Sequence, residues 1–338
     1  MGIRLKFQNN RILVNIVKYV IGIILIILLL TRVNIHELLI TIKKSNYVLV
    51  FLSVAMFGLA GFTLGFRLHV LLKKFGFTLS SSLQILFISI FFNNVTTSVV
   101  GDAYKTVIFR KKMASYKNAL AILLLERGIG FVVVILILIC FTIFAYEEIL
   151  VIFRELKIGQ GILNSNYFYI FIFICVILLL LLKKLFPKFI HIFYDFLKVF
   201  KNTGIGIKPI NYFLLILWTA VSQLLLALQI YLLIRALNEN LSIFDVLFIV
   251  ILTFIAAYIP VSVGSLGVRE GITVIGLTHY GVTLPAATAV AFMSRIIIYL
   301  YSGIGGIFFM KFKKQTSHQL PETNDLKYAP SQKQSWYN

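Results

Sequence analysis

Six long apolar segments and two interrupted ones alternate with short polar loops along this chain. The uninterrupted segments lie near residues 12–30, 47–66, 119–145, 166–186, 211–234 and 285–310. A helix needs about 20 apolar residues to cross a hydrocarbon core of about 30 Å. The pattern therefore predicts an all-α, polytopic membrane protein with about six full transmembrane helices.

The two interrupted segments carry polar residues, Gly or Pro inside an apolar run. The first covers 83–101 and breaks between 93 and 102, and the second covers 246–259 and breaks between 260 and 270. We expect each to form a re-entrant hairpin that enters and leaves the membrane on one side. Interrupted segments at corresponding places in two halves of a membrane protein point to a substrate site in transporters.

The distribution of basic residues predicts the orientation. If both hairpins re-enter, the loops of one face hold 21 Lys and Arg residues and those of the other face hold six. Basic loops stay in the cytoplasm, so we predict a multi-pass protein of the plasma (inner) membrane with both termini cytoplasmic. The two units of hairpin and following helix then run in opposite directions, which is consistent with an inverted repeat. In the alternative, 83–100 crosses completely and places the basic residues of 105–117 outside.

Composition supports the membrane assignment. The chain is 60% hydrophobic and 13% charged, whereas soluble domains are about 25% charged. Its net charge of +20 lies in loops between apolar segments, so we expect anionic lipid, not nucleic acid, as the partner. No metal-ligand spacing and no nucleotide-binding loop occur, so we expect no metal and no cofactor. Residues 1–312 form one integral membrane domain in this interpretation, and residues 313–338 form a disordered cytoplasmic tail.

Two arginines follow the breaks inside apolar segments. Arg127 lies nine residues into the segment 119–145, and Arg295 lies eleven residues into 285–310, so each is on the order of 13–16 Å from a membrane face. Both are too deep for the side chain to reach water easily. They either bind an anionic headgroup such as a phosphate or form structural ion pairs with Glu126 or Glu270. Glu126 and Arg127 are neighbours on a helix and point about 100° apart, which leaves Arg127 available for Glu270, a loop carbonyl or substrate.

The breaks supply further candidates for substrate binding. In the second break Gly264 and Gly267 permit unusual backbone angles, and Arg269 and Glu270 open a short helix that ends near residue 280. The free N–H groups at such a helix start favour an anion. In the first break the hydroxyls and amides, including Ser98, satisfy exposed backbone groups, and Gly101 with Asp102 is expected to turn the chain. We therefore predict a substrate site without catalytic residues, formed by Ser98, Asp102, Glu126, Arg127, Gly264, Gly267, Arg269, Glu270 and Arg295.

At these segments the chain resembles the transmembrane part of lysyl-phosphatidylglycerol synthases, a flippase-like family that also occurs as stand-alone membrane proteins. The matching stretches are 101–105 (GDAYK), 123–128 (LLLERG) and 260–270 (PVSVGSLGVRE). The family usually has Pro-Gly-Gly before Leu-Gly-x-Arg-Glu, whereas Val263-Gly264-Ser265 precedes that motif in this chain. The resemblance covers most of residues 10–312.

The resemblance implies a role with lipids. In two-part family members the membrane part is taken to flip an aminoacylated lipid, which a soluble C-terminal domain makes from aminoacyl-tRNA. This chain ends 28 residues after its last apolar segment, so we expect it to lack that transferase domain and not to act as an enzyme by itself. The leading hypothesis is a translocase for an anionic, aminoacylated or glycosylated phospholipid. The alternatives are an enzyme of lipid modification, with Glu126, Glu270 or Asp102 as general base, and a membrane subunit for a separately encoded lipid-modifying enzyme.

Overall fold

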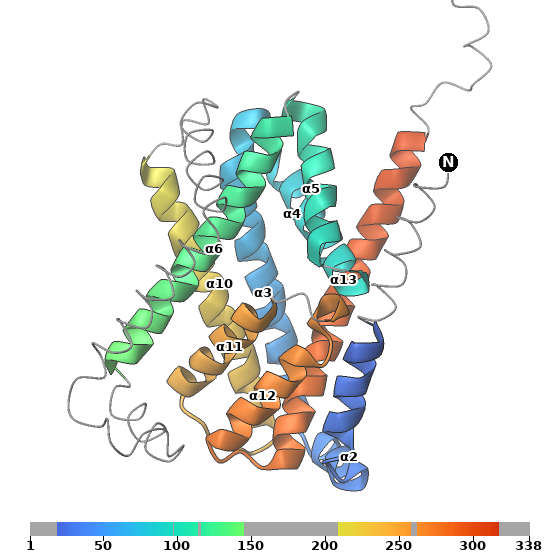
Figure 1. Cartoon of the computed structure of the whole chain (residues 1–338), viewed down its shortest axis with the longest axis vertical. Coiled ribbons are helices and arrows are strands. Elements are labelled where there is room, and N and C mark those ends of the chain that lie inside the picture. Colours follow the sequence, from blue (N-terminus) through green and yellow to red (C-terminus); the bar gives the residue numbers. More distant parts are fainter. Residues whose placement is uncertain (1–18, 97, 114–115, 145–208, 258–261, 318–338) are drawn as a thin grey trace, which may run out of the picture.

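The computed structural model describes residues 19–96, 98–113, 116–144, 209–257 and 262–317. Within these ranges the regular structure is helical (Figure 1). The α-helices are α2 (Ile35–Lys43), α3 (Tyr47–Leu72), α4 (Leu79–Val95), α5 (Ser98–Met113), α6 (Tyr116–Phe144), α10 (Pro209–Ala236), α11 (Ile243–Ala257), α12 (Val268–His279) and α13 (Leu284–Ser317). Two short 3-10 helices, η1 (Lys73–Phe75) and η2 (Val263–Ser265), lie between them.

Polar N-cap side chains mark the first residues of several of these helices. Asn34, Asn46 and Thr78 cap α2, α3 and α4, and each side-chain oxygen accepts a hydrogen bond from a backbone N–H of the first turn. Such caps satisfy donors that would otherwise have no partner at a helix start. The helix limits are therefore set by local sequence, although the apolar runs around them are nearly continuous.

Four helical stretches are long and apolar enough to span a membrane: Tyr47–Phe75, Tyr116–Cys140, Ile210–Ala236 and Leu284–Lys311. The bent pair Tyr19–Leu30 and Ile35–Lys43, with an angle of 85° between its helices, brings the number to five at most among the described residues. These stretches confirm a polytopic all-α membrane protein. Of the other predicted spans, 166–186 lies outside the described residues, and 12–30 is described only from Tyr19 onward.

The two interrupted segments form pairs of short helices. α4 has 17 residues and α11 has 15, which corresponds to about 26 Å and about 22 Å at 1.5 Å per residue. Each packs against the helix that follows its break, α4 against α5 and α11 against α12. In Figure 1 the pair α4 and α5 occupies the upper half of the molecule and the pair α11 and α12 the lower half.

The first break is shorter than the sequence suggested. We expected the chain to turn at Gly101 and Asp102, but α4 ends at Val95 and α5 already begins at Ser98. Gly101 has another role, because a side chain there would lie 2.5 Å from the carbonyl oxygen of Ser89. The missing side chain lets α5 pack closely on α4.

Buried apolar side chains form two clusters, one around each helix pair. One cluster includes Leu68, Ile88, Phe109 and Ile122, and so joins α3, α4, α5 and α6. The other joins α2 and α10 through α13, with Leu233, Ile249, Leu277 and Val290 among its members. Among the described helices, α3 and α10 make the most extensive contact, which links the two halves.

The last helix, α13, crosses from one half to the other and packs on α4. At Gly305 the two backbones are so close that a Cβ atom would lie 2.0 Å from the carbonyl oxygen of Phe87. Beyond this contact α13 continues to Ser317, whereas we expected the tail to begin at residue 313. Residues 318–338 of that predicted tail lie outside the described residues.

Replacing Gly305 with Ala should destabilise the packing of α13 on α4, because backbone atoms must shift to accept the methyl group. We expect a loss of about 1–3 kcal/mol, measured as a lower unfolding temperature of the protein in detergent. Gly303→Ala is the matched control, since no atom lies within 4 Å of its added Cβ. Equal unfolding temperatures for the two variants would contradict this packing.

Candidate functional site

The tips of the two broken helix pairs meet inside the molecule. Residues Asn93 and Asn94 at the end of α4 contact Gly264 in η2. A side chain at Gly264 would lie 2.9 Å from the carbonyl oxygen of Asn94, and the φ angle of +57° at this position also favours glycine. The two tips therefore depend on a glycine to pack backbone against backbone.

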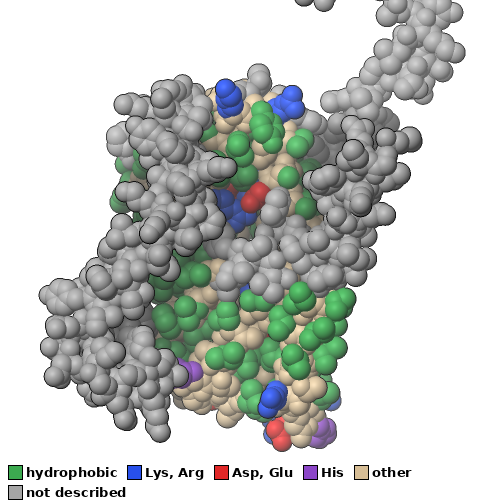
Figure 2. All heavy atoms as spheres, in the orientation of Figure 1, with side chains coloured by type: hydrophobic (Ala, Val, Ile, Leu, Met, Phe, Trp, Pro, Cys, Tyr) green, Lys and Arg blue, Asp and Glu red, His purple; other side chains and the backbone are tan. Residues whose placement is uncertain are grey.

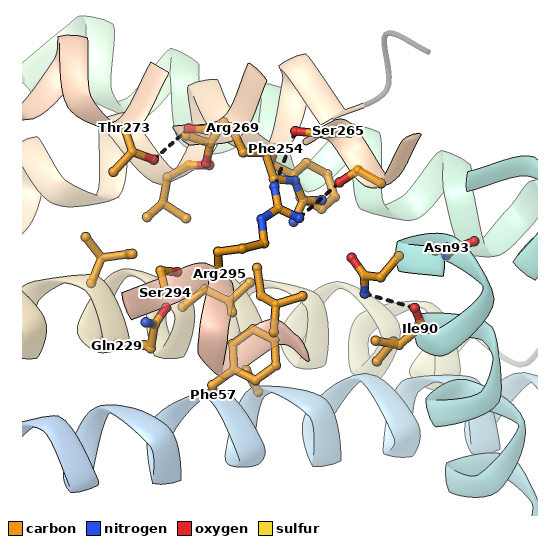
Figure 3. Close-up of a pocket in the computed structure, with 18 of the residues that line it drawn as sticks. Phe57, Ile90, Asn93, Gln229, Phe254, Ser265, Arg269, Thr273, Ser294 and Arg295 are labelled. Carbon is orange, nitrogen blue, oxygen red and sulfur yellow. Dashed lines mark hydrogen bonds between the residues drawn. The ribbon is translucent and has the colours of Figure 1, made fainter. Parts of the chain in front are cut away.

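A cavity of about 280 Å³ lies next to this contact. Residues of α3, α4, α6, α10, α11, η2, α12 and α13 line it. Figure 3 shows the side chain of Arg295 reaching from α13 across the cavity toward Ser265, with Phe57 of α3 on the other wall. Of its described lining residues, four are charged: Arg127, Arg269, Glu270 and Arg295. Irregular backbone at membrane depth is tolerated where it is buried in protein, and Val263 and Ser265 of η2 are buried.

Arg295 is held by the second break on three sides. Its Nε donates a short hydrogen bond to Oε1 of Glu270, and its terminal nitrogens donate to the carbonyl oxygens of Gly264 (3.1 Å) and Ser265 (3.3 Å). The other carboxylate oxygen of Glu270 accepts the backbone N–H of Gly267 at 2.7 Å, at the start of α12. Both charged side chains are buried, with 6% and 3% exposure. The guanidinium therefore fixes the carbonyl groups of the break and the first turn of α12 together.

The first helix pair carries an equivalent ion pair. Oδ2 of Asp102 on α5 accepts hydrogen bonds from Nε (3.0 Å) and Nη2 (2.6 Å) of Arg127 on α6. The acid precedes its arginine by 25 residues, as Glu270 precedes Arg295. The side chains of Arg127 and Asp102 are 36% and 18% exposed, however, so this ion pair is less buried than the pair of Arg295 and Glu270. Figure 2 shows basic and acidic side chains side by side in a hollow in the upper half of the molecule.

A third charged cluster lies behind Arg127. The carboxylate of Glu126 accepts hydrogen bonds from Nζ of Lys105 (2.8 and 3.1 Å) and from Nη2 of Arg67 (3.1 Å), whose Nη1 also donates to the hydroxyl of Thr219 (3.3 Å). All four residues are buried. The cluster ties α3, α5, α6 and α10 together, and its two cations exceed its one carboxylate. The carboxylate of Glu126 therefore links these helices. Removing it would leave two buried cations without a counter-charge and would destabilise the packing of the helices.

The structure brings most of the predicted site residues to one place. Gly264, Arg127, Arg269, Glu270 and Arg295 line the cavity. Gly267 lies next to it at the start of α12, and Asp102 holds Arg127 from outside the described lining.

The remaining two predicted site residues are Glu126 and Ser98. Glu126 points into the third cluster, and Ser98 begins α5 with a side chain outside the described part of the structure. The substrate contacts of all nine predicted residues stay predictions. The sequence did not single out Asp102 among the acids as the partner of Arg127, because this pairing depends on how α5 packs against α6.

Sequence analysis missed the buried positions of Arg67 and Lys105. Arg67 was assigned to a cytoplasmic loop because the predicted span ended at residue 66, but α3 continues to Leu72 and buries it. Lys105 was likewise counted as a loop residue. A signal was present at Arg67, since apolar residues flank it on both sides. Without these two residues the basic charge of the predicted cytoplasmic face is 19 against six, so the asymmetry persists.

Neutralising Glu126 should destabilise the fold, because Arg67 and Lys105 would then face each other without a counter-charge. We expect Glu126→Gln to lower the free energy of unfolding by about 3–5 kcal/mol, measured in detergent by thermal or denaturant unfolding. Glu37→Gln, which removes an exposed acid from the first turn of α2, is the control and should change stability by less than about 1 kcal/mol. Similar unfolding curves for the two variants would contradict the role of the cluster.

Comparison with known proteins places this site in a family. The family model described as "Lysylphosphatidylglycerol synthase TM region" matches residues 15–306, which include both helix pairs and all of the charged residues around the cavity. No curated protein and no solved structure gives a significant match. The chain belongs to the family of lysylphosphatidylglycerol synthase transmembrane regions.

Proposed function

We propose that this protein is a lipid translocase that moves an anionic phospholipid between the leaflets of the plasma membrane. The observation that best supports this function is the cavity between the meeting tips of the two helix pairs, with three arginines and one carboxylate in its described wall. Charges at such depth are costly and mark substrate pathways in membrane proteins. Membership of a family named for lipid chemistry supports a lipid cargo.

The wall of the cavity suits a phosphate with apolar groups beside it. Guanidinium groups bind phosphate through paired N–H donors, and Arg127 and Arg269 come from opposite halves of the molecule. Apolar side chains, among them Phe57, Phe87 and Phe254, form much of the remaining lining. In the proposed mechanism the headgroup enters the cavity while the acyl chains stay in the surrounding lipid.

The two ion pairs supply a basis for alternating access. The pair of Arg127 and Asp102 is partly exposed, whereas the pair of Arg295 and Glu270 is buried. In the orientation predicted from the charge distribution, the exposed pair lies toward the cytoplasm. Transport then requires η2 to move away from the end of α4. In this movement the side of the Arg127 and Asp102 pair closes, and the side of the Arg295 and Glu270 pair opens.

The charges favour transport over a transferase reaction. A transferase needs a general base that is available to substrate. Asp102, Glu126 and Glu270 are each held by a basic side chain in this structure. A role as membrane subunit of a separately encoded lipid-modifying enzyme is the other alternative, and the experiment below distinguishes it.

Removing positive charge from the cavity should slow lipid movement. Purified protein in liposomes with phosphatidylglycerol that carries a fluorophore on an acyl chain is assayed by chemical quenching of the outer leaflet. We expect Arg127→Gln combined with Arg269→Gln to reduce the rate at least about 10-fold, since each charge-assisted hydrogen bond contributes about 1.5–3 kcal/mol.

The matched control is Arg110→Gln combined with Arg235→Gln, which removes the same charge from exposed positions on α5 and α10 outside the described lining. This variant should keep the wild-type rate. Equal rates for the two double variants, or a wild-type rate no higher than in liposomes without protein, would overturn the proposal. Co-purification of a lipid-modifying enzyme without lipid movement would favour the membrane-subunit alternative.

A further inference from the structure

The helix Tyr19–Leu30 touches both of the tips that meet inside the molecule. Figure 1 shows this helix in dark blue on the lower half. The hydroxyl of Tyr19 donates a hydrogen bond to the carbonyl oxygen of Val95, the last residue of α4. The last carbonyl groups of a helix have no partner within that helix, so this hydroxyl satisfies an acceptor that the first break exposes. The Tyr19 side chain therefore connects the helix to the first tip.

The same helix packs closely against the second tip, where η2 leads into α12. A Cβ atom at Gly22 would lie 3.3 Å from both the Cβ atom and the carbonyl oxygen of Leu266. A Cβ atom at Gly267 would lie 2.5 Å from the Cβ atom of Leu25 and 3.0 Å from the carbonyl oxygen of Gly22. Gly22 is buried. The second tip and the helix thus approach each other at two positions that lack side chains.

Apolar contacts fix the other end of this helix to the second half of the molecule. Leu29 and Leu30 pack against the buried cluster that joins α2 and α10 through α13, and Val33 in the following turn belongs to that cluster. A single hydrogen bond contributes little net free energy compared with a buried apolar surface. The bond of Tyr19 to the first tip can therefore break while the helix stays attached to the second half.

We infer that the hydroxyl of Tyr19 is a latch between the two helix pairs. Through the helix Tyr19–Leu30 it holds the second tip against the end of α4, and it releases Val95 when the tips separate. Tyr19 is a positioning residue, because it acts on the cavity through the two tips and lies outside the described lining. The inference rests on the proposed function, since it names a bond that the proposed alternating movement must break.

The test measures how often η2 leaves the end of α4 in the purified full-length protein in detergent. Val263 of η2 is 3% exposed and lies outside the described lining, and η2 packs on α4. Val263→Cys is introduced into protein with Cys140 and Cys175 replaced by serine, and its rate of labelling by a thiol reagent is followed. We expect Tyr19→Phe to raise this rate about three- to ten-fold, because it removes one hydrogen bond between helices and keeps the ring.

Two controls match this change. Tyr47→Phe removes the same kind of bond, from a tyrosine hydroxyl to the carbonyl oxygen of Lys43 (3.1 Å) at the end of α2, and should leave the labelling rate at Val263 unchanged. Val246→Cys reports general loosening of the fold, since Val246 is a fully buried valine of α11. Its labelling rate should be the same with and without Tyr19→Phe.

A pair of crosslinks tests whether the helix moves with the second tip. Cβ atoms at positions 22 and 266 would lie 3.3 Å apart, close to the separation of about 3.5–4.5 Å in disulfides. Gly22→Cys combined with Leu266→Cys should therefore form a disulfide, and lipid movement in liposomes should continue after oxidation. Tyr19→Cys combined with Val95→Cys and joined by a short bismaleimide should stop lipid movement, because the latch is then permanent.

Three results would overturn the latch. They are equal labelling rates at Val263 in Tyr19→Phe and Tyr47→Phe, an equal rise in the labelling of Val246→Cys, and loss of lipid movement when positions 22 and 266 are joined. The labelling rates do not depend on transport, so they separate this failure from failure of the translocase. Faster labelling at Val263 in protein that moves no lipid would overturn the translocase and support the bond between the tips. Lipid movement with unchanged labelling would do the opposite.

Discussion

The buried ion pair between Arg295 and Glu270 is the interaction on which the rest of the site depends. A lone guanidinium or carboxylate at that depth would be very unfavourable, so the two must stay together. Because Arg295 also binds the carbonyl oxygens of Gly264 and Ser265, the pair fixes a stretch of irregular backbone that could not otherwise lie inside a membrane. That stretch places Gly264 against the tip of α4, and the cavity follows from this contact.

The first helix pair repeats the arrangement with one difference. Asp102 and Arg127 have the same separation in sequence as Glu270 and Arg295, but they lie in a more exposed environment. Behind them the buried cluster around Glu126 anchors α5 and α6 to α3. The two halves therefore share a chemical plan and differ in the burial of their ion pairs, and the proposed alternating access requires such an asymmetry in any one state.

The local sequence predicted where the apolar helices are interrupted and which charged residues lie inside apolar segments. The start of the helix at Arg269 and Glu270 is confirmed by α12. Arg127 and Arg295 both line the cavity, where they pair with Asp102 and Glu270. These features could be predicted because a charge or glycine in an apolar run has few favourable environments. Which acid pairs with which arginine could not be predicted in this way, since the ion pair of Arg127 with Asp102 depends on the packing of α5 against α6.

Other features depend on the three-dimensional fold alone. The burial of Arg67 follows from the continuation of α3 beyond residue 66, and the role of Gly101 follows from the close approach of α5 to α4.

Water access to the cavity is the most direct measure of the central claim, that the two helix pairs enclose a polar space within the membrane. Single cysteines at Ser294, in the cavity wall, and at Ile296, which is 58% exposed on the apolar surface of α13, are introduced into a protein with Cys140 and Cys175 replaced by serine. Labelling with a charged, membrane-impermeant thiol reagent is then measured in membranes opened to both sides. The account predicts that Ser294→Cys reacts and is protected by phosphatidylglycerol, while Ile296→Cys does not react. Faster labelling at position 296 than at position 294 would contradict it.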